Sequence, residues 1–204
     1  MLGGGPASGK SSVLDSGLVD APKRTDAVFI NADDIKEALP ENERMRFRGN
    51  NADFFRASEF AHEESSILAK RIQKRAIENG QDVVLDGTGD SAVGKLANKV
   101  EQARQAGYKV NGLYVTIPTE EAVIRSNKRA LGETARYVPV NVVRTTHQDV
   151  SRTLPLAIEA GLFDKVSLWD NTERGNLKKI GEGEGSNFVI YDAQGWADFL
   201  AKKG

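Results

Sequence analysis

The chain has 204 residues, a formal net charge of −1 and no cysteine. Its length suits one domain, and the lack of cysteine excludes disulfides, thiolate nucleophiles and cysteine-ligated zinc. The near-zero charge gives no overall basic field for nucleic acid, and no apolar run reaches the roughly 18 residues of a membrane span. No apolar leader begins the chain, so we expect a cytoplasmic protein with neither a nucleic-acid nor a membrane partner.

Strand-like and helical patterns alternate along the chain. Short β-branched runs end in small or acidic residues, longer stretches repeat apolar residues at helical spacing, and the late segment 177–191 suggests a hairpin followed by a short helix. This alternation predicts an α/β fold, with a parallel sheet flanked by helices on both faces and an edge hairpin, in one domain over 1–204. The strands are expected at 27–30, 83–85, 110–117 and 166–169, and the helices at 52–79, 92–105, from Thr119 onward and at 139–160. Thr119 is expected to be the N-cap of the helix that begins there.

A glycine-rich stretch near the start matches the P-loop pattern G-x-x-x-x-G-K-[ST] from Gly4 to Ser11. Glycines let main-chain N–H groups turn inward around phosphate oxygens, Lys10 supplies positive charge, and the Ser11 hydroxyl can bind Mg²⁺. The alternative is a flexible glycine turn. Only Met1 and Leu2 precede Gly3, so we expect either that most of the strand before the loop is missing or that neighbouring strands close up around a short remnant of it. The residues predicted to bind ATP are Gly4, Gly5, Pro6, Ala7, Ser8, Gly9, Lys10, Ser11 and Ser12.

Acidic residues follow two of the expected strands, where parallel sheets bind ligands. Asp33 or Asp34 could accept a proton from a substrate hydroxyl, or one of them could cap the helix that begins there. Asp86 fits a Mg²⁺ ligand and equally a substrate contact beside Thr88.

Arginines follow in the second half of the chain. Arg125 and Arg129 are four residues apart and share a helix face, and Arg136 lies in a short loop. They could stabilise the negative charge that spreads over the phosphoryl group in the transition state of its transfer. Alternatively, they could form a solvated basic helix face. His62 and His147 are expected to be surface or capping residues, and Asn171 could touch adenine.

Together these motifs, from the P-loop through Asn31-Ala32-Asp33 and Asp86-Gly87-Thr88 to Thr134-Ala135-Arg136, resemble the zeta toxin family of P-loop kinases. The best-known members phosphorylate a sugar hydroxyl of UDP-N-acetylglucosamine with ATP and Mg²⁺, and an antitoxin often restrains them. The resemblance implies that Asp33 is the catalytic base and that Lys10, Arg125 and Arg136 act on the phosphates, with Arg129 as a rival to Arg125. It also implies substrate contacts for Asp34, Glu64, Asp86 and Thr88, with Ser11 and Asp86 as metal ligands.

The function predicted is therefore an ATP-dependent kinase for a hydroxyl of a small molecule, with a nucleotide sugar as the preferred acceptor and an antitoxin as a possible partner. Asn31 departs from the family, whose toxins usually carry an acid there. Two other functions stay open: a polynucleotide or nucleoside kinase, and a catalytically silent ATP-binding interaction module.

Overall fold

The computed structural model describes residues 1–40, 51–89, 92–131, 138–173 and 176–204, without the side chains of 51–60 and 62. It forms two compact units. Unit 1 comprises Met1–Ala21 and Thr88–Gly204, and unit 2 comprises Pro22–Gly87. Each unit is described by itself, and the single domain expected over 1–204 stays a prediction.

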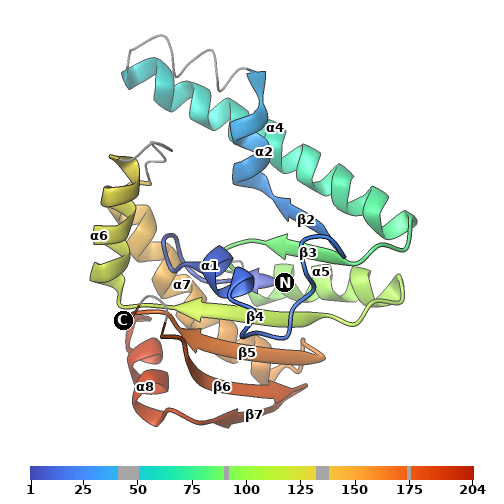
Figure 1. Ribbon diagram of the computed structural model, residues 1–204, viewed down its shortest axis with the longest axis vertical. Helices are drawn as coiled ribbons and strands as arrows, with labels where there is room; N and C mark the ends of the chain where they lie inside the picture. The colour runs from blue at the N-terminus through green and yellow to red at the C-terminus, as the bar shows by residue number, and fades with distance from the viewer. Residues whose placement is uncertain (41–50, 90–91, 132–137, 174–175) are drawn as a thin grey trace. The chain divides into compact units, whose positions relative to one another are not determined.

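The sheet of unit 1 begins with parallel strands and ends in an antiparallel hairpin. Strands β1 (Leu2–Gly3), β4 (Asn111–Thr116) and β5 (Lys165–Asp170) run parallel, and β6 (Lys178–Glu184) and β7 (Asn187–Ile190) follow antiparallel. Figure 1 shows β4, β5, β6 and β7 side by side. The edge hairpin expected over 177–191 is therefore confirmed. The strand before the P-loop comprises two residues, and Leu2 and Gly3 pair with Leu113 and Tyr114 of β4.

Helices cover this sheet because its parallel strands are apolar on both faces. The five helices of unit 1 are α1 (Lys10–Asp15), α5 (Val93–Gln105), α6 (Thr119–Ala130), α7 (Val140–Glu159) and α8 (Ala193–Ala201). Tyr114 of β4 packs edge-on against Phe163, with ring centroids 5.9 Å apart. Both side chains are buried in a core that α5, α7 and α8 complete with Leu96, Val100, Val150, Leu154, Ala157, Ile158 and Phe199.

The described residues of unit 2 form parallel strands and helices. Strands β2 (Val28–Asn31) and β3 (Val83–Asp86) pair in register, so that Asn31 lies opposite Asp86 at their carboxyl ends. Helices α2 (Ala32–Ala38) and α4 (Asn51–Glu78) belong to the same unit. Among the side chains described here, Ile30, Leu39, Ala61, Ala76 and Val84 are buried.

The α/β fold predicted from sequence is confirmed, with a mostly parallel sheet flanked by helices. One predicted helix cap is wrong, and one alternative is excluded. Thr119 is the first residue of α6 and Pro118 holds the cap position, without a side-chain hydrogen bond. Neither Asp33 nor Asp34 caps α2, because Asn31 does. In the parts of the chain described, no helix combines the length and apolarity that a membrane span requires.

Candidate active site

The P-loop connects β1 to α1 in unit 1, as the motif predicts. The main chain has positive φ at Gly4 (138°), Ala7 (61°) and Gly9 (84°), and α1 begins directly after Gly9. The Gly4 N–H donates to the Thr88 carbonyl at 2.7 Å, and the Lys10 ammonium donates to the Gly4 carbonyl at 3.0 Å. The loop thus closes on itself, with Lys10 folded across it.

Two loop glycines are required by their neighbours as well as by phosphate. A Cβ at Gly5 would overlap the imidazole of His147, and a Cβ at Gly9 would overlap the side-chain amide of Asn171. The positive φ of Gly9 disfavours any side chain for a second reason. Two buried polar side chains therefore press against one side of the loop and fix its path.

His147 on α7 is one of these supports. Its ring is 3% exposed, and Nε2 lies 3.0 Å from the Pro6 carbonyl. A carbonyl only accepts, so Nε2 carries the proton and donates it. Burial lowers the pKa of His147 to about 4, against the opposing effect of this bond, and the charges of Lys202 and Lys10 lower it further. The expectation that His147 is a surface or capping residue is wrong, because α7 buries it beneath the loop.

Asn171 is the second support, at the end of β5. It is 4% exposed, its side-chain amide donates to the Ser8 carbonyl at 2.9 Å, and its N–H donates to the Thr116 carbonyl at 3.0 Å. Its amide group thus contacts the P-loop itself, which the expected adenine contact did not anticipate.

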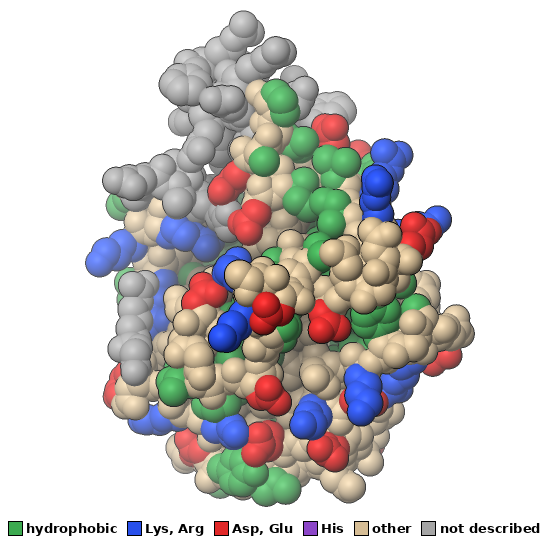
Figure 2. Space-filling model, turned by 45° about the vertical axis from the view of Figure 1, so that its right-hand side comes forward, with side chains coloured by type: hydrophobic (Ala, Val, Ile, Leu, Met, Phe, Trp, Pro, Cys, Tyr) green, Lys and Arg blue, Asp and Glu red, His purple; other side chains and the backbone are tan. Residues whose placement is uncertain are grey.

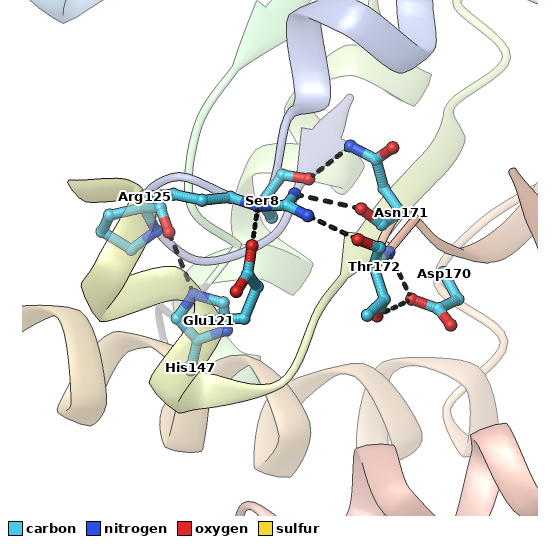
Figure 3. A network of polar contacts seen from close by, with 8 residues as sticks. Ser8, Glu121, Arg125, His147, Asp170, Asn171 and Thr172 are labelled. Carbon is cyan, nitrogen blue, oxygen red and sulfur yellow. Dashed lines mark hydrogen bonds and ion pairs between the residues drawn. The ribbon is translucent and has the colours of Figure 1, made fainter. Parts of the chain in front are cut away.

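Arg125 on α6 contacts the same corner of the chain (Figure 3). Its Nε donates to Glu121 at 2.7 Å, and its two terminal nitrogens donate to the carbonyls of Asn171 at 3.0 Å and Thr172 at 2.6 Å. The side chain is 9% exposed. Arg129 lies one turn further along, in the last turn of α6, and is partly buried.

Unit 2 carries the predicted acidic residues. The Asn31 side-chain oxygen accepts the Asp33 N–H at 2.8 Å, and its NH₂ donates to Asp86 at 3.0 Å. Asp33 and Asp34 are exposed in the first turn of α2. One amide therefore caps the helix that carries Asp33 and holds the carboxylate of the next strand. Glu64 lies exposed on α4.

The P-loop fits the phosphates of ATP, because positive φ at Gly4, Ala7 and Gly9 turns the main chain sharply just before α1, and turns of this kind let successive N–H groups face an anion. Within the described ranges, no group of three His, Asp or Glu side chains could hold a metal. The lack of such a cluster among the described residues is compatible with Mg²⁺ binding, because proteins usually hold Mg²⁺ through one or two side chains together with substrate phosphates.

The structure brings some predicted residues together and separates others by unit. Unit 1 contains residues 4–12, Thr88, Arg125 and Arg129, and unit 2 contains Asp33, Asp34, Glu64 and Asp86. Arg136 lies outside the described residues. Sequence reasoning missed the supporting roles of His147 and Asn171 and the double role of Asn31. A polar residue near the carboxyl end of an expected strand was the available signal for both asparagines, whereas nothing local distinguishes His147.

A loop of this kind between the first strand and first helix of a mostly parallel sheet defines a P-loop, kinase-like α/β protein. The zeta toxin family model matches residues 1–178. The chain belongs to the zeta toxin family.

Similar solved structures show the same fold. A chain of the AvrRxo1-ORF1:-ORF2 complex with ATP has a TM-score of 0.75 and 20% identity, and the match covers 100% of this chain and 63% of that one. A chain from the PezAT chromosomal toxin-antitoxin system of Streptococcus pneumoniae has a TM-score of 0.70 and 13% identity, over 98% of this chain and 75% of that one.

One curated relative is similar in sequence over a shorter region. It is a calmodulin calcium-dependent NAD kinase from Arabidopsis thaliana, 33% identical over 91 residues. The match covers 43% of this chain and 17% of the relative, so the chain spans a small part of that protein's length.

Proposed function

We propose that the protein is an ATP-dependent kinase that phosphorylates a hydroxyl group of a small molecule. The observation that carries this proposal is the P-loop, whose path is fixed by close contact with the side chains of His147 and Asn171. Membership of the zeta toxin family and the neighbour determined with ATP support the same conclusion.

Residues of unit 1 would hold the nucleotide. ATP would supply the transferred phosphoryl group, and Mg²⁺ would neutralise charge on its phosphates. Lys10 would exchange its present bond to the Gly4 carbonyl for phosphate oxygens, and the Ser11 hydroxyl would bind the metal. Arg129 and Arg136 are the arginines that we propose to clamp the phosphates.

Residues of unit 2 would serve the acceptor. Asp33, in the first turn of α2, would accept the proton of the attacking hydroxyl as general base. Asp86, held by Asn31, would bind the acceptor or the metal. Asp34 and Glu64 of unit 2, and Thr88 of unit 1, are further proposed substrate contacts.

The acceptor that we propose is a sugar hydroxyl of a nucleotide. Family resemblance favours UDP-N-acetylglucosamine, and the sequence relative is named for an activity on NAD. Both molecules present sugar hydroxyls next to a pyrophosphate, so one site chemistry could serve either. The 91-residue match is the specific observation that places NAD beside the nucleotide sugar in the test.

A transfer assay with labelled γ-phosphate tests the proposal. Purified protein is incubated with Mg²⁺, ATP and, in turn, UDP-N-acetylglucosamine, NAD, nucleosides and oligonucleotides. We expect label on a nucleotide-linked sugar, and Asp33→Asn should lose about 10²–10⁴-fold of the rate while retaining ATP affinity. Asp34→Asn is the comparison variant: as a proposed substrate contact, Asp34 should affect acceptor binding more than the rate of transfer. Loss of transfer in Asp34→Asn but not in Asp33→Asn would show that Asp34 is the base, and absence of Mg²⁺-dependent ATP binding by calorimetry would refute the kinase.

The other candidates receive less support. On the face shown in Figure 2, Lys and Arg side chains lie interspersed with Asp and Glu, an arrangement that does not favour a nucleic-acid strand on that face. A silent ATP-binding module would bind the nucleotide without transferring label. We propose an antitoxin as partner because one structural neighbour comes from a toxin-antitoxin system, and a cytoplasmic location would suit all of these substrates.

A further inference from the structure

The corner that follows β5 is fixed from several sides, all within unit 1. The Asp170 carboxylate accepts hydrogen bonds from the Thr172 N–H, at 2.8 Å, and from the Thr172 hydroxyl. These two bonds turn the chain sharply. The Asn171 N–H donates to the Thr116 carbonyl of β4. These bonds leave the Asn171 side chain directed at the P-loop (Figure 3).

Contact between this corner and the P-loop is close. The buried Asn171 amide donates to the Ser8 carbonyl at 2.9 Å, and it lies so near Gly9 that a Cβ there would overlap it. Any displacement of Asn171 would therefore change the path of the loop just before α1, because packed interiors transmit shifts of this size.

Arg125 holds the corner from the other side. Its two terminal nitrogens donate to the successive carbonyls of Asn171 and Thr172, and Glu121 fixes the remaining nitrogen. The planar guanidinium suits this forked contact, and the single ammonium of lysine could not reproduce it. In this arrangement each of its nitrogens donates to the protein.

We infer that Arg125 and Asn171 are positioning residues for nucleotide binding, with Arg125 acting on the P-loop through Asn171. This assignment replaces the phosphate clamp that family resemblance suggested for Arg125. It rests on the proposed function only in taking the P-loop as the nucleotide-binding element.

Calorimetry of nucleotide binding separates positioning from clamping. A residue that positions the loop should affect ATP and ADP equally, whereas a clamp on the γ-phosphate should affect ATP alone. We expect Arg125→Lys and Asn171→Ala each to weaken both nucleotides by about tenfold, the scale of one hydrogen bond to a charged group. Arg144→Lys is the matched control. Arg144 lies on α7 and forms an exposed ion pair with Glu120, which lies on α6 together with Arg125.

A double-mutant cycle then tests whether Arg125 acts through Asn171. If it does, the double variant should bind about tenfold more weakly than the natural protein, like either single variant. Independent effects would multiply to about 100-fold. Multiplied losses, or a loss confined to ATP, would overturn the inference.

Amide hydrogen exchange of the peptide carrying Gly5 to Lys10 gives a readout that needs no nucleotide. We expect faster exchange in Arg125→Lys than in Arg144→Lys. Unchanged exchange would overturn the positioning role even in a protein that binds no ATP. Faster exchange without ATP binding would uphold the mechanical link while refuting the kinase.

Discussion

Acidification should destabilise the protein through a single side chain, His147. The ring is buried, donates from Nε2 to the Pro6 carbonyl and lies in the field of Lys10 and Lys202. A second proton would place an imidazolium in this apolar and positively charged setting. Burial is the main reason that the pKa of His147 falls to about 4.

The size of the effect follows from linkage. Between pH 6.5 and about 4 the unfolded chain binds a proton at this histidine and the native protein does not. The stability that the neutral His147 ring contributes is therefore fully present above pH 6.5 and is lost as the pH falls through the native pKa of about 4. A fall in pKa from 6.5 to about 4 corresponds to about 3 kcal/mol of unfolding free energy.

Urea unfolding at a series of pH values from 7 to 4 measures this loss. His147→Gln is the control, because its amide can donate to the Pro6 carbonyl and does not titrate. We expect the natural protein to lose up to about 3 kcal/mol more than His147→Gln across the range. All other ionisable groups are common to both proteins, so the comparison isolates the contribution of His147. Parallel stability profiles would refute the argument that His147 is buried in its neutral form.

Three further predictions concern the loop and the acidic residues. Gly9→Ala should abolish ATP binding, measured by calorimetry, and should lower the free energy of unfolding in urea by about 1–3 kcal/mol. The reason is that the main chain has a φ of 84° at this position and that Asn171 leaves no room for a Cβ. Unchanged ATP binding would contradict this packing argument. Lys10→Ala should weaken ATP binding and remove phosphate transfer, whereas full transfer would exclude its role. Asn31→Ala should lower the free energy of unfolding by about 1 kcal/mol, because α2 loses its N-cap. It should also lower turnover, because Asp86 loses a hydrogen bond from the Asn31 side chain. An unaltered melting midpoint would count against the capping role.

Much of the fold was predictable because it depends on local patterns. Alternating strand and helix signals gave the order of the elements, and the P-loop motif located the loop between β1 and α1. The cap of α6 was misassigned because Thr119 and Pro118 are adjacent and both suit a helix start. Distinguishing them requires the backbone angles, which a one-residue shift alters.

The supporting residues of the loop were less predictable because their roles arise from tertiary contacts. His147 lies 141 positions from Pro6, and Asn171 lies 163 positions from Ser8. No local pattern connects such pairs. Arg125 illustrates the same limit: its helix spacing indicated a basic face, whereas its donors turn inward to a corner that forms only when β5 pairs with β4.

The close fit of His147 against Gly5 also constrains how this sequence can vary. Position 5 can accept a methyl group only if position 147 gives up volume, so the two sites should change together among homologues. An engineer who wishes to enlarge the loop residue should first shorten the histidine, for example with His147→Ser before Gly5→Ala. Paired substitutions of this kind among homologues would indicate the contact between positions 5 and 147, which one sequence alone does not reveal.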